Sequence, residues 1–101
     1  MEISADYLHK VRTAVRRSEN IETDEELTDL VKECRADLIS LGVLEERAVD
    51  ENDPLILGAV RCFVRWKFGL SGDDRDGSRR DYMQLRDELR KRVAYCTIQS
   101  G

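Results

Sequence analysis

The segment from Asp53 to Gly69 has a defined start, a defined end and an almost wholly apolar interior. An aspartate before a helix accepts hydrogen bonds from the first free amides, and Pro54 at the first helical position loses only an amide that has no partner. Gly69 is suited to a helix C-terminus, and only three residues between Pro54 and Gly69 are charged. A helix that is apolar nearly all round has to be covered by other elements. The sequence therefore predicts a buried central helix with further helices around it.

Two amphipathic helices are expected before this central helix. Apolar residues recur every three or four positions from about Ser4 to Arg17, and Ser4 is a suitable N-cap. The next helix is predicted to begin at Thr23, because Thr23 and Glu26 form a capping box. Its narrow apolar face extends toward Gly42, where a glycine favours a left-handed C-terminal cap.

One amphipathic helix is expected after the central helix. Residues 43–52 are interpreted as an acidic connector, and Leu70–Ser78 as a polar, glycine-rich loop that is long for a connection between helices. The last helix is predicted to follow this loop and to end at about Tyr95. The expected fold is all-α: a single domain over residues 1–101, built as a small bundle of about four helices with a central buried helix.

The residues that most often carry catalysis or metal binding are sparse. The chain has three cysteines, Cys34, Cys62 and Cys96, and one histidine, His9, without the paired spacing of a zinc site. Each cysteine falls on the apolar stripe of a predicted helix, so we expect small buried side chains in a reducing compartment. With no phosphate-binding loop or catalytic triad in the sequence, neither an enzyme nor a cofactor is expected. No apolar run is long enough to span a membrane and no secretory leader is recognised, so no membrane partner is expected.

Charge is abundant and unevenly distributed along the chain. Charged residues make up 38% of the sequence and the net charge is −4, but residues 21–51 alone carry a net −8 and residues 52–101 a net +3. Solvated helix faces of different sign account for this pattern without any function. Alternatively, the acidic second helix of one subunit meets the basic last helix of a neighbour, and such a head-to-tail contact closes into a ring. The residues assigned to this contact are Glu33, Asp37, Arg86 and Arg90.

The basic residues of the last helix also permit a nucleic-acid interpretation. Six basic side chains lie between Arg79 and Arg92, but Asp81, Asp87 and Glu88 are interleaved with them. The sequence pI is about 5.0, and no aromatic platform is predicted beside the arginines. A dedicated DNA-binding domain is therefore the less favoured interpretation.

Two motifs in a fixed order suggest a family. The first is Asp53-Pro54-Leu55-Ile56, followed by Ala59-Val60, Phe63-Val64 and Lys67-Phe68-Gly69; after an acidic loop, the second is Asp81-Tyr82-Met83-Gln84-Leu85-Arg86 with Leu89 one turn on. In order and spacing the chain resembles the head–tail connector family of tailed phages, the small adaptor or head-completion proteins that are also described as DNA-packaging proteins. The resemblance covers about residues 23–93. The sequence departs from the family pattern at Cys62-Phe63, where an aromatic is common, and in its shorter loop at 71–78.

The resemblance implies a structural role in a bacteriophage or prophage. Such a protein forms a homo-oligomeric ring beneath the portal protein, completes the head after DNA packaging and offers the attachment surface for a stopper or tail-completion protein. The ring is expected to be a dodecamer when assembled, from a chain that can be monomeric when free, with DNA only as passing cargo in the channel. The implied location is the virion, after assembly in the cytoplasm of the bacterial host.

Site residues follow from the resemblance only as regions. The loop and the start of the last helix are the candidates for channel or neighbour contact, and the C-terminal tail is the candidate for docking onto the portal or the tail. Trp66 and Phe68 are expected in the core. Two other classes remain open: a small helical DNA-binding or regulatory protein of a mobile element, and an unrelated bacterial interaction module. The candidate residues are Asp73, Asp74, Arg75, Asp76, Arg79 and Arg80 for the channel or neighbour, and Thr97, Ile98, Gln99 and Ser100 for docking.

Overall fold

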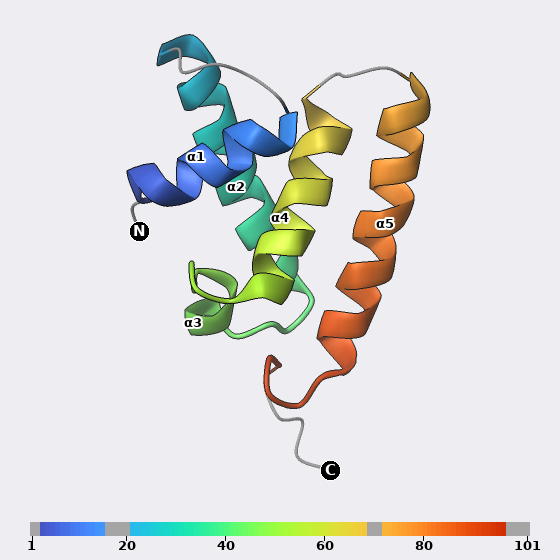
Figure 1. Ribbon diagram of the computed structural model, residues 1–101. Helices are drawn as coiled ribbons and strands as arrows, with labels where there is room; N and C mark the ends of the chain where they lie inside the picture. The colour runs from blue at the N-terminus through green and yellow to red at the C-terminus, as the bar shows by residue number, and fades with distance from the viewer. Residues whose placement is uncertain (1–2, 16–20, 69–71, 97–101) are drawn as a thin grey trace.

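The computed structural model describes residues 3–15, 21–68 and 72–96, without the side chains of 21–22 and 72–74. Over this part of the chain the protein is all-α, as predicted, and has no β-strand (Figure 1). Its radius of gyration of 13.5 Å is close to the roughly 13 Å of a compact chain of this length. The helices are α1 (Ala5–Val15), α2 (Ile21–Ser40), α3 (Glu45–Ala48), α4 (Pro54–Lys67) and α5 (Gly72–Lys91).

Helix α4 is the predicted central helix, and its start is the one that the sequence predicts. The Asp53 carboxylate accepts hydrogen bonds from the amides of Leu55 at 2.8 Å and Ile56 at 3.2 Å, with Pro54 at the first helical position. Helices α1, α2 and α5 all pack against α4. Its buried face consists of Ile56, Ala59, Val60, Phe63 and Val64.

Helix α1 begins at the predicted N-cap, because the Ser4 hydroxyl accepts a hydrogen bond from the amide of Tyr7 at 3.1 Å. The helix ends at Val15, and Arg17, its predicted end, lies outside the described residues. An ion pair of 3.1 Å between Arg12 and Asp24 connects α1 to α2.

Helix α2 begins earlier than predicted. It starts at Ile21, so Thr23 lies inside the first turn and is not the N-cap. A capping box in the sequence marks the start of a helix only to within a turn, since a glutamate such as Glu26 also stabilises a first turn through the helix dipole.

The C-terminus of α2 confirms the cap predicted at Gly42. The backbone φ of Gly42 is +105°, a value that strains residues with a Cβ. The amide of Gly42 donates to the carbonyl of Ile39, and the amide of Val43 donates to the carbonyl of Leu38. This pair of bonds is a Schellman motif, which ends the helix and turns the chain toward α3.

The acidic connector contains a helix that the sequence analysis did not predict. Helix α3 is a single turn, with the amide of Ala48 bonded to the carbonyl of Leu44 and its side chain fully buried. One buried alanine in four residues gives no helical period, so only the packing reveals this turn.

The predicted loop at Leu70–Ser78 is wrong over most of its length. Helix α5 begins at Gly72, and Ser78, one of the supposed loop residues, is buried within it. The Gly72 and Gly77 positions suggested a loop, but acidic residues between them favour a helix start through the dipole. The first turns of α5 are mostly polar, so they lack the apolar period from which a helix is recognised in a sequence.

Helix α5 ends earlier than the sequence predicts, at Lys91 and not at about Tyr95. A turn follows in which the amides of Tyr95 and Cys96 both bond to the carbonyl of Arg92. The carbonyl of Tyr95 then accepts a 2.7 Å bond from the amide of Leu44. This bond, which sequence periodicity does not encode, draws the chain beneath the bundle toward the segment after α2 (Figure 1).

Candidate interaction surface

A polar network joins α2 to α5 around the carboxylate of Asp37. The Tyr82 hydroxyl donates a 2.6 Å hydrogen bond to Asp37 Oδ2, and Arg86 Nε donates to the same oxygen at 2.8 Å. A longer bond of 3.4 Å joins Arg86 Nη2 to Asp37 Oδ1. Behind the network, the thiol of Cys34 lies 3.8 Å from the Tyr82 hydroxyl. The Tyr82 ring is buried, so the network places one polar cluster at the edge of the core.

The network shifts the pKa values of its members in opposite directions. Burial alone raises the pKa of the Asp37 carboxyl, but the hydrogen bonds from Arg86 and Tyr82 outweigh burial, and the net pKa is below its ordinary value. Burial, followed by the negative neighbours, raises the pKa of Tyr82 far above the ordinary value for tyrosine. Burial also raises the pKa of Cys34 to about 12. The cluster is therefore a fixed ion pair with a neutral tyrosine and a neutral thiol at neutral pH, and not an activated nucleophile.

Two of the predicted interface residues, Asp37 and Arg86, therefore form an ion pair within one chain. Sequence analysis assigned Asp37 and Arg86 to opposite sides of a contact between copies, whereas the structure pairs them within the protomer. Arg90 also has an internal partner, Asp87, at 2.9 Å on the same helix. A neighbour is not needed to balance these charges.

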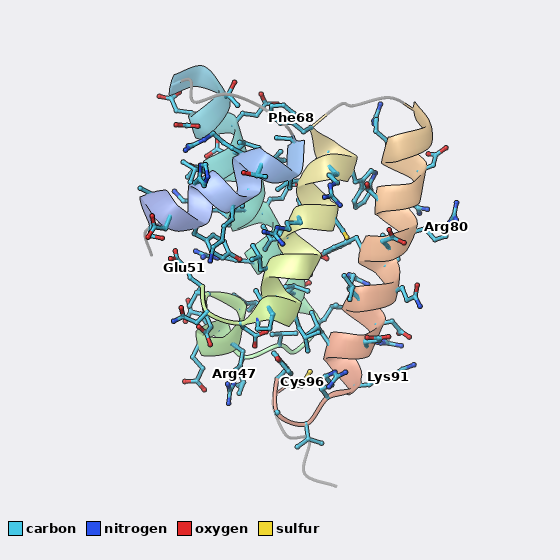
Figure 2. The ribbon with its side chains drawn as sticks, in the orientation of Figure 1. Arg47, Glu51, Phe68, Arg80, Lys91 and Cys96 are labelled. Atoms are coloured by element: carbon cyan, nitrogen blue, oxygen red, sulfur yellow. The ribbon has the colours of Figure 1, made fainter. Side chains whose placement is uncertain are left out.

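The other predicted interface residues remain at the surface. Glu33, Arg75, Asp76, Arg79 and Arg80 have exposed side chains. Arg80 points outward from α5, away from the other helices (Figure 2). Asp73 and Asp74 belong to the first turn of α5, but their side chains, like residues Thr97, Ile98, Gln99 and Ser100, lie outside the described part of the chain.

A groove of about 290 Å³ opens beside the Asp37 network, between α2 and α5. Its floor comes from α4, and its walls come from the facing edges of α2 and α5. Helices α2 and α5 each pack against α4 but make no extensive contact with each other, which leaves this space between them. The lining residues are Glu33, Asp37, Phe63, Trp66, Lys67, Tyr82, Met83 and Arg86.

Cations gather around the indole at the floor of the groove. The ammonium of Lys67 lies 4.2 Å from the centroid of the Trp66 ring, and the guanidinium of Arg79 lies 5.8 Å from it. Arg75 Nε donates a 3.4 Å bond to the backbone carbonyl of Trp66. Such cation–π contacts are electrostatic and hold the cations over the ring face.

This arrangement corrects one expectation from the sequence. An aromatic does accompany the arginines of the last helix, because α4 presents Trp66 to the N-terminal half of α5. Trp66 and Phe68, expected in the core, are half-buried and pack against its edge. Sequence analysis did not assign Trp66, Lys67 and Met83 to a site. The signal that could have indicated them is the single tryptophan of the chain, which lies between Arg65 and Lys67 at the charged end of an apolar helix.

Few other side chains among the described residues could bind a metal ion or act as a nucleophile. Within 3–15, 21–68 and 72–96, no three histidine, cysteine or carboxylate side chains are grouped so that they could hold a metal ion. Cys34 is buried, while Cys62 and Cys96 are half-buried, and all three are free thiols. Among the described helices, none is both long enough and apolar enough to cross a membrane.

Comparison with the models of known protein families, with curated protein sequences and with solved structures finds no match to this chain.

Proposed function

We propose that the protein is a structural head–tail connector of a tailed bacteriophage or prophage. The proposal rests on the two-part motif, whose described residues lie on α4, on α5 or next to the ends of α4. The capping residue Asp53 precedes α4, and the motif residues Ile56, Ala59, Val60, Phe63 and Val64 form its buried face. On α5, Tyr82 and Leu89 are buried and Leu85 packs against the core. A motif whose members build one packing unit is more informative than the same letters scattered over a surface.

Charge complementarity supports a ring made by contacts between unlike faces. Apart from the internal Asp37–Arg86 pair, α2 carries exposed acidic residues and α5 carries exposed basic residues. The residues named below form no ion pair with another described residue. Unlike faces that meet head to tail close into a ring when the rotation permits. Outside the groove and the surroundings of Trp66, the exposed acidic residues of α2 are Glu25, Glu26 and Asp29, and an exposed basic residue of α5 is Arg80.

In this function the chain does no chemistry. It is expected to bind beneath the portal protein after packaging, extend the DNA channel as a ring and present a surface to a stopper or tail-completion protein. The Asp37 network would fix α5 relative to α2, so that the acidic and basic surfaces keep a constant separation in every copy.

Binding to the portal tests the proposal with purified components. The protein is mixed with portal rings from the same phage and the mixture is sedimented, with bovine serum albumin as the unrelated control. We expect the protein to sediment with the portal at a fixed ratio that matches the portal's symmetry. Failure to bind either empty portal rings or DNA-filled heads contradicts a connector role.

The Trp66 surface favours one second candidate, a small helical DNA-binding or regulatory protein of a mobile element. Trp66, Lys67 and Arg79 together combine an aromatic face with two cations, the combination that binds single-stranded nucleic acid. If this function holds, affinity for a labelled oligonucleotide falls steeply with added salt and is lost in Arg79→Glu. Salt-independent or unmeasurable binding rejects it.

A further inference from the structure

None of the described residues fills the groove between α2 and α5. Both helices rest on α4, and side chains such as Asp37 and Arg86 reach across between them. Bundles of this kind bury a further helix in such a space by packing its side chains between the ridges of its neighbours. The groove is therefore shaped for side chains carried by a helix.

The floor and one wall of the groove offer apolar surface to such side chains. Trp66 is half-buried on the floor, and Met83, on the α5 wall, is one of three large hydrophobic residues left exposed among the described residues. Methionine beside an aromatic ring adapts readily to different apolar partners. An apolar side chain placed here covers surface that water otherwise contacts.

Charges of opposite sign lie around the groove. On the α2 wall, Glu33 is exposed and forms no ion pair within the described part of the chain. On the floor, the ammonium of Lys67 lies over the Trp66 ring, and the guanidinium of Arg79 on α5, beside the groove lining, lies over the same ring. A complementary occupant has basic residues on its edge toward α2 and acidic residues on its edge toward Lys67 and Arg79.

A second copy of the chain has no described helix to place in the groove. The apolar faces of α1, α2, α4 and α5 are already buried in the protein's own core. The other two large hydrophobic residues exposed in the described ranges, Ile39 and Val93, lie on α2 and beyond the end of α5 and form no helical stripe together. The described part of the chain offers no helix for the groove, and this favours an occupant from a different polypeptide.

We propose that this groove is the docking site for an amphipathic helix of a partner protein, with apolar side chains on Trp66 and Met83, a basic edge toward Glu33 and an acidic edge toward Lys67 and Arg79. The proposal does not depend on the connector assignment. A helix in a groove is a recurrent mode of recognition, in which apolar anchors give affinity and flanking charges set the orientation.

A displayed peptide library provides the probe. The peptides are about 16 residues long, with apolar residues at helical spacing and randomised acidic or basic residues on both flanks. They are selected against the full-length protein. We expect enriched peptides to carry basic residues on one flank and acidic residues on the other, and to change the emission of Trp66, the only tryptophan in the chain.

Two groove variants and two matched controls locate the binding site. Met83→Glu places a charge on the apolar wall, and Glu33→Lys reverses the α2 wall. Their controls introduce the same residues at exposed positions outside the groove, Gln84→Glu on α5 and Glu46→Lys on α3. We expect each groove variant to weaken peptide binding by about tenfold or more, and each control to leave binding unchanged.

Three results overturn the proposal. The first is that no peptide is enriched, and the second is that enriched peptides bind the groove variants and the controls equally well. The third is that the protein alone forms a dimer in sedimentation that Met83→Glu dissociates, because the occupant is then a second copy. Circular dichroism and thermal unfolding of every variant separate lost binding from lost folding.

Discussion

The hydroxyl of Tyr82 donates a 2.6 Å hydrogen bond to the carboxylate of Asp37 and so connects α5 to α2 beside the groove between them. The hydroxyl of Tyr7 presents the opposite case, because it is buried without a hydrogen-bond partner among the described residues. The same chemical change at the two tyrosines therefore has opposite consequences.

Tyr82→Phe is expected to destabilise the fold by about 1.5–3 kcal/mol, since it removes a hydrogen bond to a charged group. Tyr7→Phe removes a hydroxyl that has lost its water without gaining a partner, so it is expected to be neutral or stabilising by up to about 1 kcal/mol. Urea unfolding of both variants, followed by circular dichroism, measures the difference. Equal losses of stability in the two variants would contradict the assigned role of the Tyr82 hydroxyl.

The ion pair between Asp37 and Arg86 predicts a loss of stability in acid. The pKa of Asp37 is lower in the folded chain than the roughly 3.9 of an unfolded aspartate, so the folded state binds fewer protons near that pH. Its contribution is fully present at neutral pH and is lost as the pH falls through the folded pKa. The free energy of unfolding of wild type should therefore exceed that of Asp37→Asn at pH 7 by about 1 kcal/mol, with a smaller difference near pH 3.

Arg86→Gln supplies the control for this pH dependence. Without the guanidinium, the carboxylate of Asp37 loses the partner that lowers its pKa most directly, and Asp37→Asn in this background should have a smaller effect that varies less with pH. Additive effects of the two substitutions at neutral pH would show that the pair contributes nothing to stability.

Two glycines are expected to respond to alanine with opposite signs. Gly42 has a φ of +105°, so Gly42→Ala introduces backbone strain and is expected to destabilise the fold by about 1–2 kcal/mol. Gly77 lies inside α5 with nothing within 4 Å of an added Cβ, and Gly77→Ala is expected to stabilise the fold by about 0.5–1 kcal/mol. Thermal unfolding gives both values. A stabilising Gly42→Ala would contradict the left-handed cap, and a destabilising Gly77→Ala would contradict the early start of α5.

The Asp53 cap predicts a graded response. Asp53→Ala removes the acceptor for two amides at the start of the central helix, with an expected loss of about 1–2 kcal/mol. Asp53→Asn keeps an acceptor oxygen and should lose only a fraction of this. The melting temperatures of the two variants, measured side by side, test the order. An Asn variant as unstable as the Ala variant would indicate that the cap acts through its charge alone.

Local sequence signals predicted the parts of the fold that local chemistry determines. Asp53-Pro54 and Gly42 act through their own backbone and nearest amides, so their positions in the sequence sufficed. The start of α5 was misjudged because Gly72 and Gly77 suggest a loop, whereas burial of Ser78 depends on packing against the rest of the fold. Packing overrides weak local preferences of this kind.

The candidate site was harder to predict than the fold. Its acidic and basic residues were named from their charge, but the sequence does not state whether Asp37 meets an arginine of its own chain or of another. That choice depends on how α2 and α5 lie across α4, a tertiary relationship. The approach of Trp66 to Arg79 has the same origin, since α4 and α5 bring together residues 13 positions apart.

The proposed role of this protein in completing a phage head is tested most directly by removal of its gene. The gene is deleted in the source genome, phage production is induced and the lysate is imaged by electron microscopy, with a plasmid copy of the wild-type gene as the control. A connector predicts packaged or leaking heads separated from intact tails, with tailed particles restored by the plasmid. Normal, infectious, tailed particles from the deletion would contradict the connector assignment.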